Sequence, residues 1–214
     1  LVANAVAGAN CPAPRTYFAH YYKRYLQFMD EPAITSNDIV MLGNSLTEGG
    51  GDWGKRLGKD NIINRGISGD VAMGIYDRLH QILPGKPKQI FLLIGVNDIS
   101  HDLSTDSIVQ MIEKNVTRIQ RESPETKLYL QSLLPIDESF NRYKKLTNKT
   151  YQIPEINDRL KALAKEKKID FIDLYPLFTE KGTNVLRKEL TYDGLHLKEE
   201  GYKIWVDAIK KKMK

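Results

Sequence analysis

The chain has 214 residues, of which 41% are hydrophobic and 28% charged, an ordinary globular composition that excludes a disordered or collagen-like chain. The formal net charge is +5, and because lysines that suit helix ends account for much of the excess, we expect no nucleic-acid partner. The single cysteine, Cys11, excludes an internal disulfide framework and a thiolate-rich zinc site. No apolar run has the length of a membrane span.

Residues 1–15 are expected to be an N-terminal extension, and residues 16–214 a single domain. The first ten residues are mostly small and apolar, and Ala3-Asn4-Ala5 is typical of the region around a signal cleavage site. We therefore expect export to the periplasm or the exterior, with a cytoplasmic location as the alternative. No oligomeric state is predicted.

Five short apolar runs alternate with helical patterns along the chain. Each run is continuously hydrophobic, as expected of strands that are covered on both faces. The segments between them repeat apolar residues with a period near 3.6. This alternation predicts a five-stranded parallel sheet with helices on both faces. The strand segments are 39–42, 62–63, 90–94, 128–130 and 171–174, and the clearest helical segments are 108–119, 160–164 and 202–209.

Polar motifs follow three of the predicted strands, and a fourth precedes the last helix. They cover residues 43–48, 64–70, 95–98 and 193–197. In parallel sheets the loops after the carboxyl ends of the strands carry function, so we expect these motifs to meet at one edge. Together they contain the parts of an acyl-transfer site.

Three residues of these motifs suit nucleophilic catalysis. Ser45 offers a hydroxyl at a strand-to-helix junction, and a serine hydroxyl needs a base within hydrogen-bond reach. His196 is the expected base, because imidazole exchanges protons near neutral pH. Asp193, three residues earlier, is expected to hold the other ring nitrogen and to stabilise the imidazolium.

An oxyanion formed at Ser45 needs several hydrogen-bond donors. We expect these donors to be the backbone N–H groups of Ser45 and Gly66 and the side-chain amide of Asn97. Gly66 suits this role because a residue without Cβ can approach a ligand closely. Asn44, Trp53 and Tyr143 are expected to contact the substrate, Trp53 as a wall of the pocket and Tyr143 by stacking on a sugar.

Two further patterns are expected to be structural. Asp98, His101 and Asp102 have a spacing that matches no established ligand set, so no metal site is predicted. Residues 49–55 begin a phosphate-binding glycine pattern, but Arg56 stands where a Ser or Thr hydroxyl would be needed.

The four motifs resemble, in order and spacing, those of the SGNH hydrolases, also called GDSL esterases and lipases, over residues 38–209. The resemblance implies a three-layer α/β/α sandwich with the flavodoxin-like strand order 2-1-3-4-5. It also implies Ser45, Asp193 and His196 as a catalytic triad, Gly66 and Asn97 as oxyanion donors, and no metal or organic cofactor. Asn44 stands where the family usually has Asp, and the lost charge is expected to alter loop anchoring or substrate choice.

The motifs around Ser45 and Gly66 are similar to those of the acetylhydrolase branch of the family. The expected function is hydrolysis of a short O-acyl ester, an acetyl group on a carbohydrate, through an acyl-enzyme. Neither an apolar channel nor a lid is evident in the loops, and the insertion 139–151 carries aromatic and polar residues suited to a sugar. The alternatives are a lysophospholipase or thioesterase of the same family and a non-catalytic carbohydrate-binding domain.

Overall fold

A parallel sheet in the order β2-β1-β3-β4-β5 forms the centre of the computed structural model, which describes residues 15–213. The predicted order is therefore confirmed. The strands are β1 (Ile39–Gly43), β2 (Ile62–Gly66), β3 (Gln89–Leu93), β4 (Lys127–Gln131) and β5 (Asp170–Ile172). All residues of β1 and β3 are buried, as continuous apolar runs covered on both faces should be.

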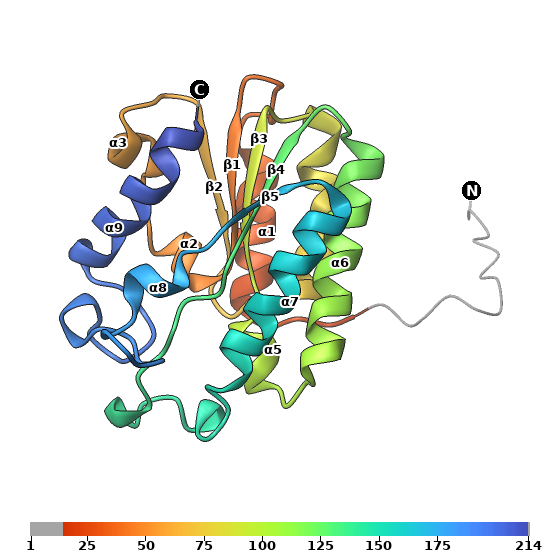
Figure 1. Cartoon of the computed structure of the whole chain (residues 1–214). Coiled ribbons are helices and arrows are strands. Elements are labelled where there is room, and N and C mark those ends of the chain that lie inside the picture. The colour runs from red at the N-terminus through yellow and green to blue at the C-terminus, as the bar shows by residue number, and fades with distance from the viewer. Residues whose placement is uncertain (1–14, 214) are drawn as a thin grey trace, which may run out of the picture.

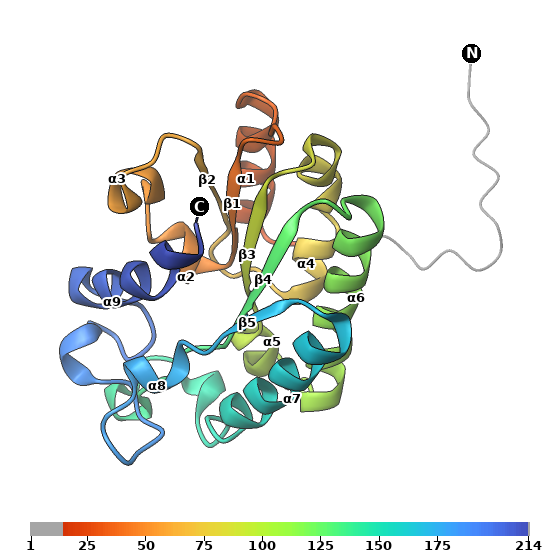
Figure 2. The same ribbon diagram turned by 45° about the horizontal axis from the view of Figure 1, so that its top comes forward.

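Helices cover both faces of the sheet, as Figures 1 and 2 show. One layer contains α1, α4, α6 and α7, and the other contains α3 and α9. The helices are α1 (Ala19–Asp30), α2 (Ser45–Glu48), α3 (Trp53–Leu57), α4 (Ala72–Tyr76), α5 (Val96–Ser100), α6 (Thr105–Glu122), α7 (Gln152–Lys167), α8 (Tyr175–Phe178) and α9 (Glu199–Ile209). Short 3₁₀ turns are η1 (Leu79–Gln81), η2 (Leu83–Gly85), η3 (Glu138–Phe140), η4 (Lys144–Leu146), η5 (Lys188–Leu190) and η6 (Lys210–Lys212).

The register of the central strands brings the predicted motifs together. Gly43, the last residue of β1, pairs with Gly66 of β2 and with Leu93 of β3. The segments that leave these three strands therefore start at the same level of the sheet. This alignment places α2, the loop 67–71 and α5 side by side at the carboxyl edge.

The predicted extension, residues 1–15, lies outside the described residues except for Arg15, and so does Cys11. Between residues 15 and 213, no helix combines the length and the apolarity needed to cross a membrane.

Candidate active site

Ser45, His196 and Asp193 form one hydrogen-bonded chain. Ser45 is the first residue of α2, directly after β1, whereas Asp193 and His196 lie on the loop that precedes α9. His196 Nε2 lies 2.9 Å from Ser45 Oγ, and His196 Nδ1 lies 2.6 Å from Asp193 Oδ2. The structure thus brings the expected nucleophile, base and carboxylate together from segments about 150 residues apart, in the arrangement that acyl transfer requires.

Asp193 is held as an ionised acceptor. Burial works to raise its pKa, but hydrogen bonds from the His196 ring and backbone, the Leu195 N–H and the Tyr143 hydroxyl outweigh burial and lower the pKa below its ordinary value. The backbone N–H groups of His196 and Leu195 donate to Asp193 Oδ1 at 2.7 and 2.9 Å. These bonds fix the carboxylate so that its other oxygen faces the imidazole.

Tyr143 contacts the catalytic candidates directly. Its hydroxyl donates to Asp193 Oδ2 at 2.7 Å and lies 3.0 Å from His196 Nδ1. Burial and the neighbouring Asp193 raise the pKa of Tyr143, so the phenol keeps its proton and remains a donor. Tyr143 also lines the cavity beside Ser45, as expected of a substrate contact, but its polar end is directed to the carboxylate.

The open space beside Ser45 is a cavity of about 600 Å³. Residues from five separate segments line it: Ser45, Ser68, Gly69, Asn97, Ser100, Arg142, Tyr143, Lys144, Lys145, Leu146, Leu195 and His196. A larger hollow of about 950 Å³, which Asn37 and Asn61 help to line at the amino ends of β1 and β2, has no serine or histidine in its lining. The candidate chemistry therefore lies in the smaller cavity.

Asn97, the predicted side-chain oxyanion donor, lines the cavity. Its amide Nδ2 donates one hydrogen to the Asp70 backbone carbonyl at 2.9 Å, which fixes the amide plane, and the second hydrogen is left for a ligand in the cavity. Ser45 begins α2, and the structure records no acceptor within residues 15–213 for its backbone N–H. Both groups can therefore donate to an oxyanion in the cavity.

The prediction that Gly66 is an oxyanion donor is wrong. β2 continues through Gly66, whose N–H donates to Asn64 Oδ1 at 2.9 Å. Gly66 is a glycine because α2 packs on it: a Cβ there would lie 2.1 Å from the Glu48 backbone nitrogen. Gly66 does not line the cavity that contains Ser45.

Gly69 is the glycine of this loop that lines the cavity, and the sequence reasoning missed it. Its φ of +85° favours glycine, and among the described residues its N–H has no acceptor. The second glycine of the motif at 64–70 was the available signal. A strand of typical length that starts at Ile62 has five residues and therefore includes Gly66. Gly69 is then the glycine that remains in the loop after the strand.

Buried polar contacts hold the loop 67–71 in place. Glu48, at the end of α2, accepts hydrogen bonds from the Ser68 N–H at 2.5 Å and from its hydroxyl at 2.7 Å. Arg78 pairs with Asp70 at 2.9 Å, and both side chains are completely buried. Burial raises the pKa of Asp70 to about 6 against the opposing effect of Arg78. Neither Glu48 nor Arg78 was predicted, because each acts through the loop and not on a substrate.

Asn44 and Trp53 are not substrate contacts, which corrects both predictions. Asn44 is fully buried and caps α2, since its Oδ1 accepts from the Leu46 N–H at 3.1 Å, a bond that an Asp could also make.

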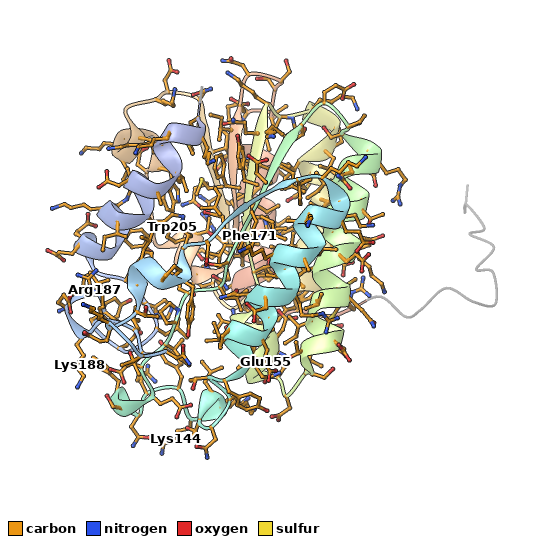
Figure 3. All side chains as sticks on the ribbon, viewed as in Figure 1. Lys144, Glu155, Phe171, Arg187, Lys188 and Trp205 are labelled. Carbon is orange, nitrogen blue, oxygen red and sulfur yellow. The ribbon has the colours of Figure 1, made fainter. Side chains whose placement is uncertain are left out.

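Trp53 is 1% exposed, and its indole N–H donates to the Thr47 carbonyl at 2.9 Å. Its ring packs edge-on against Trp205, at 5.0 Å between centroids. Figure 3 shows Trp205 between α9 and the sheet, so this pair fills the core behind α2.

Asp98 and Asp102, the two carboxylates of the pattern that includes His101, contact different partners. Asp102 forms an ion pair with Lys149, and Asp98 is buried and accepts from the Ala72 N–H at 3.1 Å. Across residues 15–213, no three His, Cys, Asp or Glu side chains are grouped so as to hold a metal ion.

Comparison with known proteins agrees with the geometry. The model of the GDSL-like lipase/acylhydrolase family matches residues 41–204. A solved GDSL-like lipase from Bacteroides thetaiotaomicron VPI-5482 is 25% identical, with a TM-score of 0.79 over 92% of this chain and 98% of that one.

Two curated relatives are longer than the region they share with this chain. The N-acylneuraminate cytidylyltransferase of Escherichia coli O18:K1:H7 (strain RS218 / NMEC) is 25% identical over 81% of this chain and 39% of its own length. The platelet-activating factor acetylhydrolase IB subunit beta homolog of Drosophila melanogaster is 24% identical over 64% of this chain and 60% of its own length. The family match includes Ser45, Asp193 and His196 and all of the sheet except the first two residues of β1. The chain belongs to the GDSL-like lipase/acylhydrolase family, within the SGNH hydrolases.

Proposed function

We propose that the protein is a serine esterase that hydrolyses short O-acyl esters, in particular an O-acetyl group on a carbohydrate. The observation that carries this proposal is the chain Ser45–His196–Asp193, which opens into a cavity that Asn97 also lines. Membership of an acylhydrolase family supports the same reaction. An intact chain of this kind argues against a purely sugar-binding role.

The reaction follows from the positions of the polar groups. His196 Nε2 takes the Ser45 hydroxyl proton while Ser45 Oγ attacks the ester carbonyl carbon. The N–H groups of Ser45 and Gly69 and the amide of Asn97 stabilise the resulting oxyanion. The imidazolium, stabilised by Asp193, then gives its proton to the departing alcohol, which leaves an acyl-enzyme. Water repeats the attack with His196 as base, and the acid is released.

The lining of the cavity favours a short acyl group. Leu146 and Leu195 are the aliphatic side chains among the described residues that line it, and they suit contact with an acetyl methyl. The hydroxyl of Ser68, which donates to Glu48, can still accept from a sugar hydroxyl, and the carbon stems of the lysines suit the flatter apolar faces of a sugar. The Drosophila relative, named as an acetylhydrolase homolog, supports the acetyl group.

A series of p-nitrophenyl esters from acetate to dodecanoate tests the proposal, followed by acetylated sugars with acetate release as the readout. We expect the highest kcat/KM with acetate and loss of turnover in Ser45→Ala. Ser139→Ala, an exposed serine outside the cavity, is the matched control and should retain activity. Turnover in Ser45→Ala equal to wild type would refute the nucleophile, and faster hydrolysis of octanoate than of acetate would refute the short acyl group.

A further inference from the structure

One part of the active-site cavity is basic. The segment 142–146, which includes the turn η4, contributes Arg142, Lys144 and Lys145 to the lining. Figure 3 shows Lys144 at the lower tip of the molecule, on this segment. No Asp or Glu side chain is among the described residues that line the cavity. The described lining of the cavity therefore includes three basic residues and no acidic one.

Nearby acidic groups offset only part of the charge of the two lysines. Asp102, whose charge also acts on Lys145, is already paired with Lys149. Arg142 also lines a small adjoining cavity with Asp137, Glu138 and Asp193, so part of its charge is balanced there. Neither Lys144 nor Lys145 forms an ion pair with a residue in the described part of the chain.

The backbone that carries these lysines is anchored on both sides. Before them, the Tyr143 hydroxyl is bonded to Asp193 at 2.7 Å. After them, Leu146 is 3% exposed and belongs to the hydrophobic core. The lysine stems therefore start from fixed positions next to Ser45 and His196, although the ammonium groups themselves are exposed.

We propose that the natural substrate is an acyl ester whose alcohol portion carries an anionic group, which Lys144 and Lys145 bind with a smaller contribution from Arg142. The proposal rests on the esterase function proposed above. Both a carboxylate and a phosphate have the required charge, and a lysine ammonium binds either as a point charge. Exposed charges of this kind act mainly on encounter and binding, so the effect should appear in kcat/KM and weaken with salt.

The test compares acetyl esters that differ only in charge. Three substrates are needed: an O-acetylated methyl hexoside, the matching hexuronate, and the matching hexose 6-phosphate. Acetate release gives kcat/KM for each, in the wild type and in the double variant Lys144→Gln/Lys145→Gln, at low and high salt. The control is Lys161→Gln/Lys165→Gln on the exposed face of α7, which removes the same charge away from the cavity.

In the wild type we expect at least one anionic ester to exceed the neutral ester in kcat/KM by roughly threefold to tenfold, the effect of two exposed ion pairs. This ratio should fall towards one in the Lys144/Lys145 variant and at high salt, and it should persist in the control. The anionic ester with the larger ratio identifies carboxylate or phosphate as the natural group.

If the wild type has a kcat/KM for both anionic esters that is no higher than for the neutral ester, the inference is wrong. Hydrolysis of the neutral ester in the same experiment would still support the esterase function. A ratio above one that the Lys144/Lys145 variant leaves unchanged, or that the control lowers equally, would also overturn it, because attraction would then come from the overall charge of +5. No hydrolysis of any ester would instead refute the proposed function.

Discussion

The Tyr143 hydroxyl donates to Asp193 Oδ2 at 2.7 Å, the same oxygen that lies 2.6 Å from His196 Nδ1. The phenol therefore shares the negative charge that would stabilise a protonated imidazole. Sharing a carboxylate oxygen weakens its interaction with each donor. Tyr143 thus acts on the base through Asp193, in addition to lining the cavity.

Replacing Tyr143 by Phe should shift the pH dependence of catalysis. Without the phenol, Asp193 loses one of the hydrogen bonds that lower its pKa, so its carboxylate is protonated at a higher pH than in the wild type. Because the proposed triad needs an ionised Asp193, we expect the acid limb of the kcat/KM profile for p-nitrophenyl acetate to move to higher pH. Full pH profiles of both proteins measure this shift. A fall in activity with the limb unmoved would mean that Tyr143 serves only in packing or substrate contact.

Asn97→Ala should lower kcat roughly 10²- to 10³-fold, the range for loss of one oxyanion donor. The substitution also removes the bond to the Asp70 carbonyl, so thermal unfolding must be measured beside kinetics. Ser100→Ala is the matched control, since Ser100 lines the same cavity but donates to the Asn97 carbonyl. An unchanged kcat with a raised KM would make Asn97 a residue of ground-state binding instead.

Gly66→Ala should destabilise the fold and report on packing. Its new Cβ would lie 2.1 Å from the Glu48 nitrogen, so α2 must move away from β2. We expect a loss of about 1–3 kcal/mol in the free energy of unfolding, as for other overpacked sites. Urea unfolding measures the loss. Full stability together with lost turnover would instead place the Gly66 N–H in the oxyanion site.

Much of the fold and of the candidate site could be predicted because both depend on patterns along the chain. Continuous apolar runs predicted the strands, the motifs after the strands pointed to Ser45 and Asn97, and the motif before the last helix pointed to Asp193 and His196. The errors at Gly66, Asn44 and Trp53 share one cause. Motif spacing shows which loop reaches the edge of the sheet, but packing decides which of its residues face the cavity. Trp53 is drawn into the core by Trp205 of α9, more than 150 residues later, which no local pattern indicates.

The buried pair of Arg78 and Asp70 leads to a prediction about stability. Arg78 donates to Asp70, to the Arg65 carbonyl and to the Gly43 carbonyl, and thereby joins the ends of β1 and β2 to the loop that contains Gly69. Arg78→Met should cost about 3–5 kcal/mol, because it leaves a buried carboxylate without its partner. The double variant Arg78→Met/Asp70→Asn should recover part of this loss. Urea unfolding at pH 7 would detect both effects, and equal stability of the single and double variants would show that the charge pair itself contributes little.

Asp98 predicts how stability changes with pH. Burial raises the pKa of Asp98 from 3.8 to about 7, against the opposing hydrogen bond from the Ala72 N–H, and the negative charge of Asp70 adds to the rise. A carboxyl whose pKa is higher in the folded state binds its proton more tightly there than in the unfolded chain. Its contribution to stability is therefore fully present below pH 4 and is lost as the pH rises to about 7.

Asp98→Asn removes this titration but keeps a side-chain oxygen that can accept the Ala72 N–H. We expect the free energy of unfolding of the variant, relative to wild type, to rise between pH 5 and pH 8, with most of the change complete near pH 7. Comparing the two proteins by urea unfolding at each pH cancels every other titrating group. A difference between the proteins that stays constant over this range would show that Asp98 is ionised in the fold throughout, and that its surroundings solvate the charge better than its burial implies.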